Sequence, residues 1–424
     1  MPRKSLRLKT IELMRERISK LRKEYIEREL LDEEDSIEDD KYLRYLTVLK
    51  DMVRKRYMYR KSYYRTNRKK FDLDDALSYD SQNFNDEEFL LHFRMSRESF
   101  FLLLEQISET EEFSKKPKKK KHRPISYQLF VFLFRIGREG VSGGSGQVGS
   151  FFGIAKGSVN NYVRRCVRAL LQLKDQVVYW PDKNERNEMR QRLSALGFRH
   201  CVGIIDGTLV QLVFRPEAYH ECYYSRKSMY CINVMIVCDD KKRIIYYNAG
   251  WPGSTHDNCV FRNSKLFYNR GKYFSQGEYL LGDSAYSASP VMVQAFKKQA
   301  SQADLPPKHE YFNKCLAQTR IASEHCIGIL KGRFMCMKKI NIKLKDSREE
   351  VKEIVDMIGA CAVLHNLLIS YDEDDIPASW YDEMTDDIDW CLYDEEEEEL
   401  PVVTAVNVER RKYVYNSLIN NFII

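Results

Sequence analysis

This chain of 424 residues lacks long hydrophobic runs and closely paired cysteines. Its longest apolar run, LFVFLF at residues 129–134, is too short to cross a bilayer, and the N-terminus has no apolar signal-peptide core. The 11 cysteines are scattered with no C-x-x-C pair, so neither a zinc knuckle nor a disulfide framework is indicated. These absences argue against a membrane or secretory role and favour free thiols in a reducing compartment.

Charge is plentiful, at 31% of the residues, and it is unevenly placed. Residues 1–70 are rich in Lys and Arg, KKPKKKKHR occupies residues 115–123, and DEEEEEL closes an acidic stretch at residues 394–400. Such segregation predicts a polyanionic partner and a location in the nucleus, reached from the cytoplasm. Interleaved Tyr and Arg in residues 54–70 suit nucleic-acid binding. A solvated arm and a solvated linker are the alternatives for these basic segments.

Helical periodicity dominates the first 180 residues. Residues 9–31 carry a short heptad seam suited to pairing with another helix, as in a homo-oligomer, although a helix folded onto its own protein has the same pattern. Further helices are predicted in residues 92–107, with Ser96 as N-cap, and in residues 126–140. The seam consists of Ile11, Met14, Ile18, Leu21 and Tyr25.

Residues 145–171, SGQVGSFFGIAKGSVNNYVRRCVRALL, predict a short helix ending near Gly153 and a second helix starting near Ser158. A glycine turn between two helices, the second with an Asn- and Arg-rich exposed side, is typical of a helix-turn-helix. Helical hairpins that bind no DNA share this spacing. The side chains predicted to read DNA are Lys156, Asn160, Asn161 and Arg164.

From residue 201 the apolar period changes from helix to strand. The predicted hairpin joined by DDKK, followed by a helix, a strand and more helices, indicates an α/β arrangement with a mixed sheet. The predicted strands are residues 202–206, 229–238, 243–249 and 279–282, and the predicted helices are residues 259–269, 289–300 and 317–334.

Carboxylates interrupt these apolar strands. Asp206 lies inside VGIIDGTLVQL, where burial is costly unless a helix N-terminus, a lysine, a turn hydrogen bond or a cation compensates it. Asp283 ends the strand YLLG, and Glu324 lies in a later helix. Two aspartates with a glutamate are hard oxygen ligands suited to Mg²⁺ or Mn²⁺. Two such ions can activate water and stabilise the leaving oxygen in phosphodiester hydrolysis.

Four motifs occur in order: IIDGT, WPGSTHDNCVFRNSKLF, LLGDSAY and RIASEHCIGILKGRF. Over roughly residues 92 to 370 the chain resembles PIF/Harbinger DDE transposases and the nucleases derived from them. The resemblance implies an RNase H-like DDE nuclease domain, a mixed sheet flanked by helices, after an all-α helix-turn-helix region. It implies a catalytic triad of Asp206, Asp283 and Glu324 that binds two Mg²⁺ or Mn²⁺ ions. Asp257 matches a fourth acidic position, either a metal ligand or a helix cap.

The resemblance also implies a function and an organisation. Arg320, Lys331 and Arg333 match basic positions expected to face DNA phosphates, or to form helix-surface ion pairs. We expect a transposase or nuclease that cuts and joins double-stranded DNA with a Myb/SANT-like partner protein. The alternative is a domesticated module that binds DNA or protein without nuclease activity. The expected regions are a charged helical N-terminus (residues 1–91), a helical domain (92–180), the nuclease domain (181–371) and an acidic tail (372–424).

Overall fold

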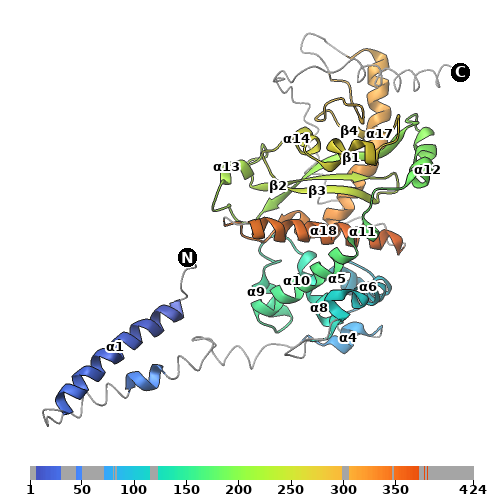
Figure 1. The fold of residues 1–424 in the computed structure, drawn as a ribbon. Helices are drawn as coiled ribbons and strands as arrows, with labels where there is room; N and C mark the ends of the chain where they lie inside the picture. Colours follow the sequence, from blue (N-terminus) through green and yellow to red (C-terminus); the bar gives the residue numbers. More distant parts are fainter. Residues whose placement is uncertain are drawn as a thin grey trace. The chain divides into compact units, whose positions relative to one another are not determined.

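The computed structural model describes most of the chain, drawn in Figure 1, in two compact units, residues 1–69 and 70–424. The predicted basic arm at residues 54–70, most of the lysine run and the acidic stretch at residues 394–400 lie outside the described residues. The described residues are 6–29, 44–49, 71–79, 81, 84–114, 123–297, 305–345, 348–371, 377 and 380.

The first unit contains the predicted N-terminal helix, α1 (Leu6–Glu29). Ile11 and Ile18, two residues of the predicted seam, are only 7% and 8% exposed. The Arg17 guanidinium lies 6.0 Å from the Tyr45 ring centroid, so the segment at residues 44–49 packs close to α1. The seam is therefore covered at least partly within the unit, which favours a helix folded onto its own protein. The side chain of Tyr25 lies outside the described residues.

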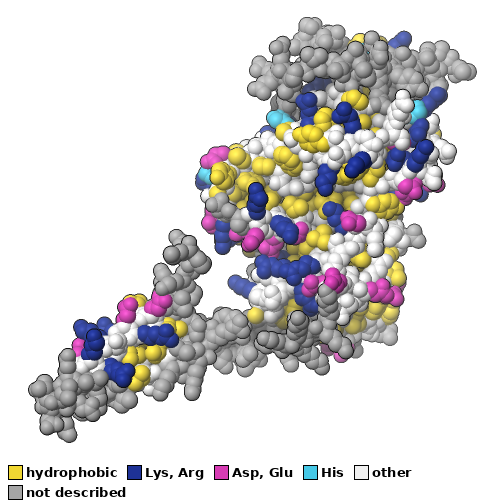
Figure 2. Space-filling view, viewed as in Figure 1, with side chains coloured by type: hydrophobic (Ala, Val, Ile, Leu, Met, Phe, Trp, Pro, Cys, Tyr) yellow, Lys and Arg dark blue, Asp and Glu magenta, His cyan; other side chains and the backbone are white. Residues whose placement is uncertain are grey.

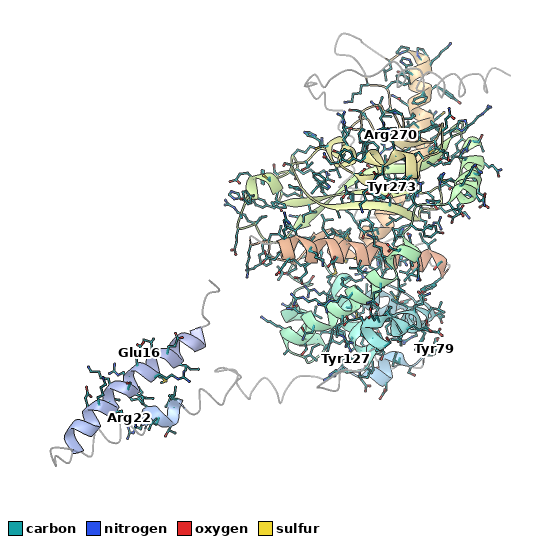
Figure 3. The ribbon with its side chains drawn as sticks, viewed as in Figure 1. Glu16, Arg22, Tyr79, Tyr127, Arg270 and Tyr273 are labelled. Atoms are coloured by element: carbon teal, nitrogen blue, oxygen red, sulfur yellow. The ribbon has the colours of Figure 1, made fainter. Side chains whose placement is uncertain are left out.

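The second unit begins with short helices that share one aromatic core. The Ser96 hydroxyl accepts a hydrogen bond from the Ser99 N–H at 3.1 Å, which confirms the predicted N-cap. Tyr127, labelled in Figure 3, donates from its hydroxyl to the Phe152 carbonyl at 2.8 Å and so ties α8 to the residue that ends α9. These helices are α4 (Leu73–Leu77), α5 (Asp86–Phe93), α6 (Arg97–Glu109), α7 (Glu111–Ser114) and α8 (Ile125–Ile136).

The two helices of the predicted helix-turn-helix are present and are joined by a short turn. α9 (Ser145–Phe151) is followed by α10 (Lys156–Gln172), with Gly153 in the left-handed conformation between them. A Cβ atom on Gly149 would approach the Ile154 carbonyl to 2.7 Å, so a glycine lets the turn pack closely on α9. Two further helices, α11 (Lys174–Val177) and α12 (Lys183–Ser194), lead to the sheet.

The mixed sheet has the order β3-β2-β1-β4-β5, with β6 paired to β1. Strand β1 is antiparallel to β2 and parallel to β4, and β2 and β3 form the predicted hairpin. This arrangement, with helices on both faces, confirms the expected fold class. The strands are β1 (Cys201–Leu212), β2 (Cys231–Cys238), β3 (Ile244–Pro252), β4 (Tyr279–Gly282), β5 (Met292–Gln294) and β6 (Lys339–Ile340).

Alternation along β1 distributes its side chains between the two faces of the sheet. Ile204 belongs to a cluster with α17, α18 and the helical region, whereas Ile205 packs in a cluster with α14 and α15. Helix α18 lies between the sheet and the helical region, so both share one core (Figure 1). The helices that follow β1 in the chain are α13 (His220–Tyr223), α14 (Asp257–Arg262), α15 (Lys265–Tyr268), α16 (Arg270–Tyr273), α17 (Pro307–Arg333) and α18 (Arg348–Ser370), with a 3₁₀ turn at Met335–Met337.

Several details of the predicted secondary structure are wrong. Strand β1 continues six residues beyond the predicted end at residue 206, and the helix expected at residues 259–269 is divided into α14 and α15. The helix expected at residues 289–300 is absent from its described part, where β5 pairs in parallel with β4 instead. Met292 and Val293 pack into different apolar clusters, the alternation of a strand, which a short apolar run does not reveal. The helix expected at residues 317–334 begins ten residues earlier, at Pro307, a favourable first residue.

Helix α18 is the one described helix with the length and apolar composition to cross a bilayer. Its most apolar stretch is 72% buried within the protein. A core helix passes the same test, and α18 packs between the sheet and α10. The helix therefore adds little support for a membrane span.

Candidate active site

Asp206 lies within β1, which continues through it without a break. The strand is paired on both sides, with Ile236 of β2 opposite Asp206 and with β4 along the other edge. The carboxylate is 18% exposed, and its Oδ2 accepts a hydrogen bond from Arg320 Nη2 at 3.1 Å. Its Oδ1 accepts from the Gly207 N–H at 2.8 Å. A guanidinium from α17 therefore supplies the nearest positive charge to this buried carboxylate.

Two further aspartates are near enough to Asp206 to act on its charge. Asp257 is the first residue of α14, and Asp283 directly follows β4. Burial raises the pKa of Asp206 to about 7, Arg320 opposes the rise, and the negative charges of Asp283 and Asp257 add to it. We call these three aspartates the acidic cluster. They come from three different elements, so the sheet and α14 assemble them.

Two neighbours hold Asp257 in the acidic cluster. Asn233 of β2, itself 3% exposed, donates from Nδ2 to Asp257 Oδ1 at 2.8 Å. A Cβ atom on Gly207 would overlap the Asp257 carboxylate, so only glycine at this position leaves room for it. Burial raises the pKa of Asp257, the bond from Asn233 lowers it, and Asp283 raises it. Sequence reasoning missed Asn233, although a single polar residue in the apolar run CINVMIVC was a usable signal.

Glu324 stands apart from the acidic cluster. It is exposed on α17, one turn beyond Arg320, and its charge acts on Arg320. It is not among the main groups that shift the pKa of Asp206 or Asp257. The described part of the chain has no group of three His, Cys, Asp or Glu side chains arranged to hold a metal ion. The structure thus brings Asp206 and Asp283 together with Asp257, rather than with Glu324 as predicted.

The acidic cluster suits a hard divalent cation by its chemistry. Its donors are carboxylate oxygens, which Mg²⁺ and Mn²⁺ prefer, and the bare backbone at Gly207 keeps one of them in place. Asp206 and Asp283 are the residues that would hold the ion, with Asp257 beside them. Arg320 occupies one oxygen of Asp206, so binding through that oxygen requires the guanidinium to move.

The three basic residues expected to face phosphate are placed differently. Arg320 pairs with Asp206 at 3.1 Å and its side chain is 15% exposed. Lys331 Nζ donates to the Leu209 carbonyl at 3.0 Å, and Lys331 is half-buried. Arg333 is 2% exposed, so the expectation that it faces phosphate is wrong for the folded chain. Long side chains on the inner face of α17 are buried because that helix packs on the sheet.

The predicted DNA-reading residues of α10 also differ in their exposure to solvent. Lys156 and Asn161 are exposed. The Arg164 side chain is 53% exposed and donates to Glu353 of α18 at 3.3 Å. Asn160 is half-buried instead of exposed, because its Oδ1 accepts hydrogen bonds from the Ser145 hydroxyl and from Arg135. Asn160 therefore holds α8 and α9 against α10, and the expectation that it is an exposed reader is corrected.

Comparison with known proteins finds similarity over the region of the chain that contains the acidic cluster. Residues 205–366 match the family model described as DDE superfamily endonuclease. The proteins named "Putative nuclease HARBI1" of Mus musculus and Homo sapiens are 25% identical over 230 residues, which cover 54% of this chain and 63% of each relative. "Protein ALP1-like" of Arabidopsis thaliana is 25% identical over 316 residues, covering 69% of this chain and 74% of that protein. No solved structure matches the chain.

Proposed function

Since residues 205–366 form a DDE superfamily endonuclease domain and the chain is homologous to the HARBI1 and ALP1-like proteins, we propose that it cuts DNA as a metal-dependent endonuclease of PIF/Harbinger type. The observation that supports this most is that Asp257 and Asp283 both lie near enough to Asp206 to act on its charge. Like charges are costly to bury together, and a divalent cation offsets that cost. Cutting and rejoining of transposon ends extends the proposal to a transposase.

The residues of the cluster have separable roles in this proposal. A divalent cation, or two, supplies the charge that activates water and stabilises the leaving oxygen. Asp206 and Asp283 would hold the ion, and Asn233 orients Asp257 beside them. Arg320 neutralises part of the charge on Asp206 in the metal-free chain, and its guanidinium is suited to bind a phosphate oxygen. Glu324 would join the set only if α17 or its side chain turned toward the cluster.

DNA contacts are proposed for the exposed residues of α10. These exposed residues lie in the first half of the helix, and the opposite side of the helix is packed into the core. They are Lys156, Asn161 and Arg164. Figure 2 shows that on the face in view the Lys and Arg side chains are mixed with Asp and Glu where α18 meets the helical region. A mixed surface of this kind binds polyanions less strongly than a uniformly basic one. The basic segments at residues 54–70 and 115–123 are therefore proposed to supply most of the phosphate contacts.

Localisation and partners follow from the same proposal. We place the chain in the nucleus, because its substrate is there and its lysine run suits an import signal. A Myb/SANT-like protein is the proposed partner, and self-association is proposed because transposon ends are cut in pairs. These statements rest on family resemblance and on composition.

A non-catalytic binding module is the second candidate. The exposed position of Glu324 and the ion pair between Arg320 and Asp206 favour it, since both suit a chain that has kept its fold without its chemistry. The three half-buried aspartates argue against it, because a binding module has no physical need for clustered carboxylates.

A plasmid-nicking assay distinguishes the two candidates. The wild-type chain should nick DNA with Mg²⁺ or Mn²⁺ and should stop in EDTA, and Asp206→Asn should abolish cleavage while DNA binding survives. Asp240→Asn is the matched control, because Asp240 is a carboxylate ion-paired with Arg192 outside the acidic cluster. Nicking that persists in EDTA, or near wild-type cleavage by Asp206→Asn, would contradict the proposal. DNA binding without any nicking by the wild type would support the second candidate.

A further inference from the structure

The hydroxyl of Tyr286 is buried beside the acidic cluster and is not used by its neighbours. Tyr286 lies three residues after Asp283 and is 1% exposed. Its Oη has no hydrogen-bond partner among the described residues. A buried hydroxyl without a partner costs free energy, and phenylalanine would fill the same space without that cost. The hydroxyl therefore calls for an explanation beyond packing.

The position of the Tyr286 ring is fixed by close contacts. Its centroid lies 6.1 Å from that of Phe261, with the rings perpendicular, and it packs in the cluster that holds α14 on the sheet. A Cβ atom on Gly282 would come within 2.8 Å of Tyr286 Cδ2, so the ring lies directly on the backbone before Asp283. The hydroxyl consequently has little freedom to reach a partner elsewhere.

Electrostatics place the hydroxyl within range of the acidic cluster. Burial raises the pKa of the Tyr286 phenol well above its usual value, and Asp257, Asp206 and Asp283 each raise it further. Arg320 acts in the opposite direction. All three members of the acidic cluster are thus close enough to act on one phenol oxygen.

Two other buried polar atoms beside the cluster share this property. Asn233 Oδ1 and Arg320 Nε have no hydrogen-bond partner among the described residues, although other atoms of both side chains bind aspartates of the cluster. With Tyr286 Oη they make one donor, one acceptor and one hydroxyl around the same carboxylates. Buried polar groups are normally satisfied, so three unsatisfied ones in one place indicate a polar ligand there.

We propose that Tyr286 is a positioning residue whose hydroxyl oxygen accepts a hydrogen bond from a water bound to the divalent cation that Asp206 and Asp283 would hold. The inference rests on the proposed function and deepens it. Mg²⁺ keeps several of its waters when one or two carboxylates bind it, and those waters donate hydrogen bonds to acceptors around them. Outer hydrogen bonds of this kind orient the inner ligands and strengthen binding.

The test is Mn²⁺ binding by the full chain, measured by calorimetry without DNA. Tyr286→Phe keeps the ring contacts with Phe261 and Gly282 and removes only Oη, so Mn²⁺ should bind about tenfold more weakly. The melting temperature of the metal-free protein should stay the same or rise, because an unsatisfied hydroxyl has been removed. Tyr371→Phe is the matched control, since its buried hydroxyl also has no hydrogen-bond partner in the described part of the chain but lies at the end of α18. That variant should bind Mn²⁺ as the wild type does.

The outcomes separate the inference from the function on which it rests. Equal Mn²⁺ affinity of Tyr286→Phe and wild type would overturn the role of Tyr286 and leave the nuclease proposal standing. A lower melting temperature of metal-free Tyr286→Phe would also overturn it, because the hydroxyl would then be structural. Failure of the wild type to bind Mn²⁺ at all would refute the metal-dependent function itself, and the role of Tyr286 with it.

Discussion

The stability of the metal-free fold should depend on pH through Asp206. Burial among like charges raises the pKa of this carboxyl from 3.8 to about 7, so the folded chain keeps a proton that the unfolded chain has lost. A folded-state pKa above the unfolded value means that the contribution to stability is largest at low pH. It is lost as the pH rises from about 4 through about 7. Asp206→Asn removes this titration without removing the side-chain volume.

The size of the effect follows from the two pKa values. Each pKa unit corresponds to about 1.4 kcal/mol, so the whole shift is worth about 4 kcal/mol. Between about pH 5 and about pH 8 the wild type should lose roughly 2–3 kcal/mol of unfolding free energy that the variant does not lose. The carboxylate is 18% exposed, and solvent screening makes this figure an upper bound.

Chemical denaturation in EDTA at several pH values measures this difference. The two unfolding free energies should diverge as the pH rises, with Asp206→Asn becoming the more stable relative to wild type. Asp257→Asn should diverge in the same direction, because burial raises the pKa of Asp257 as well. Added Mg²⁺ should flatten the wild-type curve, since the cation replaces the proton. Parallel curves for wild type and Asp206→Asn would refute the reasoning, because Asp206 would then be no member of a buried acidic cluster.

Two further predictions concern neighbouring parts of the structure. Gly207→Ala should displace the Asp257 carboxylate, destabilise the fold by about 1–3 kcal/mol in urea denaturation and abolish Mn²⁺ binding. A variant that binds Mn²⁺ normally would contradict the close packing at this glycine. Asn160→Ala should lower the melting temperature because it breaks the hydrogen bonds that hold α8 and α9. Asn161→Ala should lower only DNA affinity, measured by fluorescence anisotropy. The reverse pattern would exchange the roles of the two residues.

The fold was largely readable from the sequence because three of its strands, β1, β2 and β3, have 8 to 12 residues and are largely apolar. Ile204 and Ile205 are adjacent yet face opposite cores, as expected of a strand buried on both sides. The short strand β5 was misread because its three residues, Met292 to Gln294, are too few to show a period. Its pairing with β4 decides its conformation, and that contact is tertiary.

The site was readable only in part, for a different physical reason. Asp206 and Asp283 stand out because carboxylates are rare in buried strands. The ion pair between Arg320 and Asp206 joins residues 114 positions apart, and the rotation of α17 on the sheet decides it. The same rotation buries Arg333 and leaves Glu324 exposed. A helix with charged residues around its circumference does not reveal which of them faces inward.

Charge balance connects the ion pair to the number of cations expected. When all three carboxylates are ionised, pairing with Arg320 leaves at most two negative charges in the acidic cluster, and Arg226 also offsets part of the charge on Asp257. One divalent cation neutralises what remains. A second cation would add positive charge that Asp206, Asp257 and Asp283 cannot balance while Arg320 remains beside them. It requires another anion, either Glu324 turned inward or a phosphate of bound DNA. We therefore expect the metal-free chain to take up one ion alone and the second only together with its substrate.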